Sequence, residues 1–81
     1  MKNVTLHLLN DTFNHHLDVE NAIMEVVKLD WEDAIAATTI AHMNGSYPVF
    51  EGSQEEAEKI KLKFEELGIN TRITEVDGEP F

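Results

Sequence analysis

The chain has no cysteine and few basic residues, and both shortages exclude classes of function. Its 81 residues include 6 Lys plus Arg against 16 Asp plus Glu, which gives a formal net charge of −10 at pH 7. Without cysteine there is no disulfide, thiolate zinc site or cysteine nucleophile, and this composition fits a reducing compartment such as the cytoplasm. Because a phosphate backbone repels so acidic a surface, nucleic-acid binding is not expected.

Long apolar runs are also missing from the sequence. An alternating pattern begins directly after Met1 and Lys2, so we expect neither a signal peptide nor a membrane span, and we predict a cytoplasmic protein. The length corresponds to one small domain. We predict a single domain over residues 1–76 and a flexible tail over residues 77–81.

Apolar periodicity predicts the order β-α-α-β-α-β. Alternation predicts strands over residues 4–8, 46–50 and 69–76, and helical spacing predicts helices over residues 15–28, 31–44 and 54–67. A small three-stranded sheet covered on one face by three helices is an α+β sandwich of two layers, and this is the predicted fold class.

Polar residues and glycines set the boundaries of these elements. Side chains that can cap a helix precede each predicted helix, at Asn14, Asp30 and Ser53, and the last forms a capping box with Glu56. Glycines at 45 and 68 are expected to end helices, and Gly52 to turn the chain. Pro48 places the second strand at a sheet edge. The third helix carries a predicted buried stripe of Ala57, Ile60, Phe64 and Leu67.

The sequence contains no motif of an enzyme or of a cofactor site. A glycine-rich phosphate loop, a G-x-S-x-G motif and a metalloprotease His–Glu spacing are all missing, so we expect neither catalysis nor a cofactor. Imidazole and carboxylate groups that could bind zinc or nickel occur close together in the sequence, at His15, His16, Asp11 and Asp18. However, adjacent imidazoles at a helix start point in different directions, so no metal site is predicted.

One group of polar residues is suited to hold a cation that has several donors. Asn10 and Asp11 end the first predicted strand, and His42 ends the second predicted helix. These two ends can meet at one rim of the sandwich, and all three side chains can accept hydrogen bonds, so a protonated amine is the simplest ligand. Val19, Thr38 and Ala41 could wall a cavity beside it. Alternatively, Asn10 and Asp11 only form a turn, and His42 only complements the helix dipole.

The same residues resemble a known family. The stretch Leu9-Asn-Asp-Thr-Phe13, the helix end Ala41-His-Met-Asn-Gly45 and the pair Ala57-Glu58 together resemble the adaptor family ClpS. The ribosomal stalk protein's C-terminal domain is a fainter likeness, which shares the fold but not the Asn-Asp and His elements.

The resemblance to ClpS implies a binding function. It implies recognition of proteins with an N-terminal Phe, Leu, Tyr or Trp and their delivery to a ClpA- or ClpC-type unfoldase. By position, Asn10, Asp11 and His42 would hold the free α-amino group. The residues that would border the amine or line the side-chain pocket are Thr12, Asn14, His16, Val19, Thr38 and Ala41. Because Thr38 and Ala41 stand where the family has Met and Val, we expect a wider pocket.

The resemblance also implies a docking surface for the unfoldase at the start of the third helix, where Glu55 and Lys59 lie. Only residues 1–3 precede the first predicted strand, which is too short for the flexible extension that such adaptors use in delivery. A second hypothesis is therefore a decoy or regulatory protein that docks on an unfoldase without binding degradation signals. A third, stalk-like hypothesis makes the third helix the main contact face.

Overall fold

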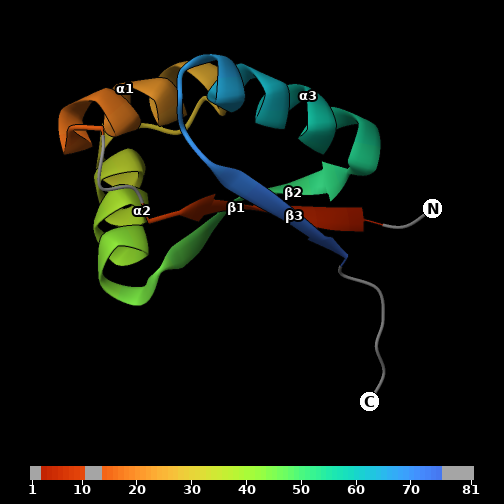
Figure 1. The fold of residues 1–81 in the computed structure, drawn as a ribbon, viewed down its shortest axis with the longest axis horizontal. Helices are drawn as coiled ribbons and strands as arrows, with labels where there is room; N and C mark the ends of the chain where they lie inside the picture. Colours follow the sequence, from red (N-terminus) through yellow and green to blue (C-terminus); the bar gives the residue numbers. More distant parts are fainter. Residues whose placement is uncertain (1–2, 11–13, 76–81) are drawn as a thin grey trace.

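The computed structural model describes residues 3–10 and 14–75, which form a sheet and a layer of helices (Figure 1). In chain order the elements are β1 (Asn3–Leu9), α1 (His16–Val26), α2 (Trp31–Asn44), β2 (Ser46–Ser53), α3 (Gln54–Glu66) and β3 (Thr71–Glu75). The helices gather on one side of the sheet, which confirms the predicted two-layer α+β fold. The predicted tail over residues 77–81 lies outside the described residues.

The sheet has the strand order β2-β1-β3, and both pairings are antiparallel. Alternate residues of the central strand, Val4, Leu6 and Leu8, are buried beneath the helices. The second strand lies at an edge, as Pro48 predicted, and its register against β1 shifts between Leu6 and His7. Because proline cannot donate a ladder hydrogen bond, an irregular edge strand accommodates it.

The core lies between the sheet and the helices. Its largest fully buried side chain is Phe64 of α3, and it packs in one cluster with Leu6, Leu8 and Ile23. Leu67 was predicted to bury on the same stripe, but its side chain is 50% exposed. It follows the end of α3 as the C-cap residue, so it has left the buried face. No helix among the described residues is long and apolar enough to cross a membrane.

Two of the three predicted N-caps are confirmed. The Asp30 carboxylate accepts a hydrogen bond from the Asp33 backbone N–H at 2.9 Å, and the Ser53 hydroxyl accepts one from the Glu56 N–H at 3.2 Å. The prediction for Asn14 is wrong, because His15 occupies the N-cap position of α1 and its side chain makes no capping bond. The Asn14 amide instead donates to the Gly68 carbonyl at 3.0 Å.

The glycines that were predicted to end α2 and α3 do so. Gly45 and Gly68 have φ angles of 100° and 79°, in the left-handed region that glycine adopts without strain. After α3, the Gly68 N–H donates to the Glu65 carbonyl and the Ile69 N–H to the Phe64 carbonyl. These two bonds form a Schellman motif, which turns the chain from α3 toward β3.

Gly52 does not turn the chain, in contrast to the sequence prediction. It lies within β2, where it pairs with Val4. A Cβ atom at this position would lie 2.8 Å from Cζ of Phe50, so the glycine makes room for the aromatic ring beside it. The strand therefore continues to Ser53, and α3 begins directly after it.

Candidate functional site

A hollow opens where β1 ends, between the first turn of α1 and the last two turns of α2. It encloses about 230 Å³, a volume that includes its open mouth. The residues that line it are Leu8, Leu9, Asn10, His16, Val19, Thr38, Ala41 and His42. These residues come from three elements that only the folded chain brings together.

A backbone hydrogen bond joins the end of β1 to the end of α2. The Asn10 N–H donates to the Gly45 carbonyl at 2.9 Å, and the Gly45 N–H donates to the Ala41 carbonyl at 2.8 Å. Because Gly45 adopts a left-handed conformation, the helix ends there and its last carbonyls are available to the strand end. The side chains of Asn10 and His42 therefore line the same hollow, as the sequence analysis expected.

The inner wall of the hollow is largely apolar. Val19 of α1 and Ala41 of α2 are buried, and so is Thr38. The Thr38 hydroxyl donates to the Ala34 carbonyl at 2.9 Å, one turn earlier in the same helix. Since this bond uses the only proton of the hydroxyl, the hydroxyl keeps acceptor capacity alone. Apolar walls below a polar rim suit a ligand with an apolar side chain and a charged end.

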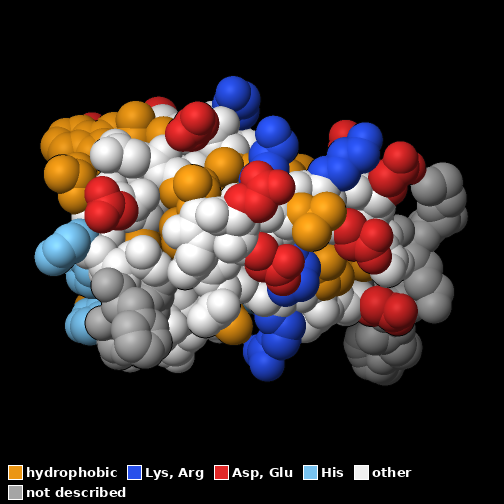
Figure 2. Space-filling view, turned by 45° about the horizontal axis from the view of Figure 1, so that its top comes forward, with side chains coloured by type: hydrophobic (Ala, Val, Ile, Leu, Met, Phe, Trp, Pro, Cys, Tyr) orange, Lys and Arg blue, Asp and Glu red, His pale blue; other side chains and the backbone are white. Residues whose placement is uncertain are grey.

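Two imidazole rings lie against each other at the mouth of the hollow. The ring centroids of His16 and His42 are 5.1 Å apart, and the rings meet edge to face at an interplanar angle of 69°. Figure 2 shows histidine side chains gathered at one end of the molecule. Sequence analysis missed this contact because it joins the start of one helix to the end of another, and no spacing along the chain encodes that meeting.

The space inside the hollow is small. Thr38 and Ala41, the small residues for which the resemblance implies a wider pocket than in the family, both line it. The volume open to the centre of a water molecule is about 10 Å³, which is room for about one water. The rings of His16 and His42 also line the hollow and contact each other.

The predicted site residues divide into three groups. Those that line the hollow are Asn10, His16, Val19, Thr38, Ala41 and His42. Asn14 is directed to the Gly68 carbonyl instead, and Asp11 and Thr12 lie outside the described residues. Leu8 and Leu9 also line the hollow, and the sequence analysis did not select them. Their position just before the Asn-Asp turn was the signal that could have identified them.

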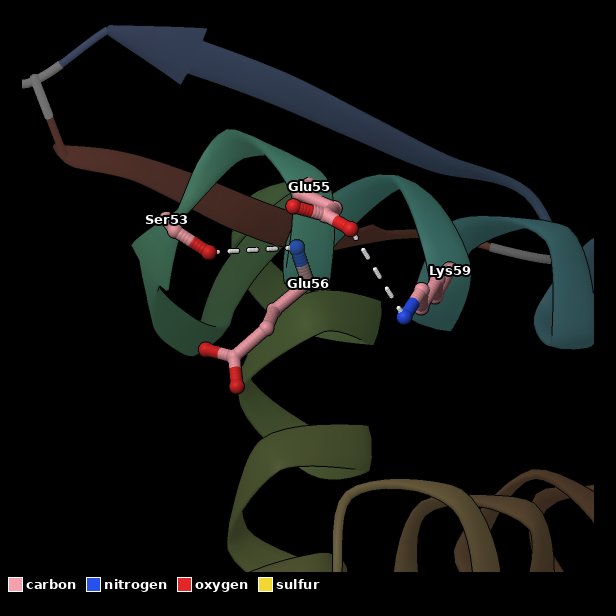
Figure 3. Close-up of polar contacts among 4 residues, drawn as sticks. All are labelled: Ser53, Glu55, Glu56 and Lys59. Atoms are coloured by element: carbon pink, nitrogen blue, oxygen red, sulfur yellow. Dashed lines mark hydrogen bonds and ion pairs between the residues drawn. The ribbon is translucent and has the colours of Figure 1, made fainter.

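The start of α3 forms a second candidate surface, away from the hollow. Figure 3 shows Glu55 and Lys59 directed toward each other along the outside of the helix, with a Glu55 Oε2 to Lys59 Nζ distance of 3.9 Å. Both side chains are more than two-thirds exposed. An exposed pair at this spacing contributes at most about 0.5 kcal/mol to stability. It is therefore available to a partner at little cost to the fold.

Within residues 3–10 and 14–75, no three His, Asp or Glu side chains cluster so that they could hold a metal ion. The described part of the site thus consists of hydrogen-bond acceptors at a rim and apolar groups below it.

The fold and the hollow define a small α+β binding module. The sequence model of a family described as "ATP-dependent Clp protease adaptor protein ClpS" matches residues 1–70, so the chain belongs to the ClpS family. The description names an adaptor of the Clp protease.

Solved structures agree with this fold, whereas no curated protein matches the sequence. The chain is similar to Agrobacterium tumefaciens ClpS2, solved bound to L-phenylalaninamide, with a TM-score of 0.88 and 20% sequence identity. The match covers 91% of this chain and 96% of the Agrobacterium chain.

Proposed function

We propose that this protein binds the free N-terminal amine and the bulky apolar first side chain of substrate proteins, for degradation by a Clp protease. The observation that carries the proposal is the convergence of Asn10 and His42 on one hollow whose inner wall is apolar. The rim supplies acceptors for an ammonium group, and Val19 and Ala41 supply apolar contacts.

The bound molecule in the similar Agrobacterium structure supports this proposal. Phenylalaninamide carries a free α-amino group next to an aromatic side chain, and it was found on a protein of the same fold. An N-terminal Phe, Leu, Tyr or Trp presents the same two chemical features. Burial of a Phe or Leu side chain contributes roughly 1.5–3 kcal/mol.

Peptide binding tests the proposal directly. We expect a fluorescent peptide that begins with Phe to bind saturably, as measured by fluorescence anisotropy, and the same peptide with an acetylated N-terminus not to bind. His42→Ala should weaken binding by roughly 1.5–3 kcal/mol, the range for a hydrogen bond to a charged group. This corresponds to about a tenfold to hundredfold increase in Kd.

His15→Ala is the matched control for His42→Ala. Its imidazole is exposed, does not line the hollow and makes no capping bond, so its removal should leave the affinity unchanged. Equal binding of the free and the acetylated peptide would contradict the proposed amine site. Equal losses in His42→Ala and His15→Ala would contradict the role of His42.

We propose a ClpA- or ClpC-type unfoldase as the protein partner, in the cytoplasm. Glu55 and Lys59 at the exposed start of α3 are the proposed contacts. They lie on a different helix from every residue that lines the hollow, so one molecule could hold a substrate and an unfoldase together.

A second function is favoured by the narrowness of the hollow. With space for the centre of only about one water molecule, the structure also fits a decoy that docks on an unfoldase without a bound degradation signal. Such a protein would compete with a peptide-binding adaptor for the unfoldase's N-terminal domain, and none of the peptides above would bind to it. A competition assay with a labelled adaptor separates the two functions.

A further inference from the structure

We propose that His16 is a second proton-sensitive residue of the amine site, so that a peptide's ammonium group binds tightly only when His16 and His42 are both neutral. This inference rests on the proposed function. It assigns to His16 a role that depends on its contact with the ring of His42.

The geometry places any charge on His16 close to the amine site. The two ring centroids are 5.1 Å apart, and both rings line the hollow. An ammonium group that hydrogen-bonds to His42 inside the hollow would therefore lie near the ring of His16. Both residues are exposed, so solvent reaches both rings.

Protonation of either histidine would weaken binding of the ammonium group, but the physical reason differs between the two residues. A protonated His42 carries N–H donors on both ring nitrogens and can no longer accept a hydrogen bond from an amine. A protonated His16 repels the ammonium charge. For unit charges about 5 Å apart, an effective dielectric constant of about 50 gives a roughly tenfold loss of affinity. Binding should therefore weaken as the pH falls through the range in which imidazoles gain protons.

Few other ionisable groups lie around the ring pair. In the last two turns of α2 His42 is the only titratable residue, and the end of β1 contributes the uncharged Asn10. The neighbours of His16 along α1 are His15, Asp18 and Glu20, none of which lines the hollow. Asp11 lies outside the described residues. These carboxylate residues are common to all variants compared below.

Proton linkage gives the proposal a measurable signature. If protonation of His42 removes the acceptor and protonation of His16 weakens binding about tenfold, the logarithm of the association constant rises with pH at a maximal slope between about 1 and 2. With His42 as the only such imidazole the slope does not exceed about 1. Between pH 5 and 7 the α-amino group of the peptide stays protonated, so it does not contribute to the slope.

The test measures binding of the Phe-initiated peptide by anisotropy from pH 5 to 7 at constant ionic strength. His16→Phe keeps an aromatic ring against His42 but removes the proton, and His15→Phe is the matched control on the adjacent exposed position. We expect the logarithm of the association constant to rise more steeply with pH for the natural protein and for His15→Phe than for His16→Phe, whose slope should not exceed about 1. Toward pH 5 His16→Phe should bind up to about tenfold more tightly than the natural protein. Equal slopes for the natural protein and His16→Phe would overturn the proposal, as would an equal reduction in His15→Phe.

A second measurement keeps this inference separate from the proposed function. If no peptide binds to the natural protein even at pH 7.5, the proposed function has failed, and NMR of the free protein then decides about the ring pair. The pH dependence of the His42 ring-proton signals should differ between the natural protein and His16→Phe, because in the natural protein these protons also sense the charge on the ring in contact with them. The same pH dependence in both proteins would overturn the coupling between the two imidazoles.

Discussion

Gly52→Ala tests the corrected role of this glycine within β2. The added Cβ would lie 2.8 Å from Cζ and 3.1 Å from Cε2 of Phe50, and 3.5 Å from Oε1 of Glu56. Contacts below 3.0 Å force a neighbour to move. The carboxylate is the flexible end of an exposed side chain, but the ring packs against the core, so the ring determines the cost.

Two opposing terms set the magnitude. Forcing an extra carbon against a packed ring costs about 1–3 kcal/mol. Replacing glycine by alanine where the backbone has an ordinary φ angle stabilises by about 0.4–1 kcal/mol, since the unfolded chain loses freedom. Gly52 is not among the residues with positive φ, so the second term applies. We expect a net loss of about 1–2 kcal/mol.

Urea unfolding followed by far-ultraviolet circular dichroism measures this loss, and a double-mutant cycle identifies its cause. A protein of 81 residues has a free energy of unfolding of about 4–12 kcal/mol, so a loss of this size is resolved. In a Phe50→Ala background the steric term disappears, and Gly52→Ala should then be neutral or stabilising. The same destabilisation in both backgrounds would refute the steric argument and point to a backbone requirement for glycine.

Two further predictions concern the ends of α3. Gly68→Ala should lower the free energy of unfolding by about 1 kcal/mol, because a φ of 79° is unfavourable for a residue with a side chain, even though nothing lies within 4 Å of the new Cβ. Urea unfolding measures this loss, and an unchanged unfolding midpoint would contradict the prediction. Glu55→Lys should lower the free energy of unfolding by less than about 0.5 kcal/mol, because the ion pair with Lys59 is exposed. The same substitution should weaken binding to the N-terminal domain of a ClpA- or ClpC-type unfoldase, as measured in a pull-down or by calorimetry. Undiminished unfoldase binding would exclude this end of the helix as the contact.

Local chemistry in the sequence was sufficient for most of the fold. The alternation of Val4, Leu6 and Leu8 predicted the buried face of the central strand, and the φ angles at the glycines after α2 and α3 agree with their predicted roles. The caps at Asp30 and Ser53 are also local, since each bond spans three residues.

Two errors occurred where a partner in the folded chain competes with the local propensity of a residue. Asn14 has the side chain of an N-cap, but its amide bonds to a carbonyl 54 residues away, at the end of α3. Gly52 is typical of a turn, but its lack of a side chain serves the ring of Phe50 within a strand. Propensity describes what a residue can do locally, and tertiary packing selects among those options.

The candidate site shows the same division. Residue chemistry identified five of the residues that line the hollow, because amides, imidazoles and small apolar residues at strand and helix ends have recognisable chemistry, and the resemblance to ClpS added His16. It could not reveal that the ring of His16 meets the ring of His42. That contact depends on how the start of α1 lies against the end of α2. Such an arrangement is set by the packing of whole helices on the sheet, and no single residue or spacing specifies it.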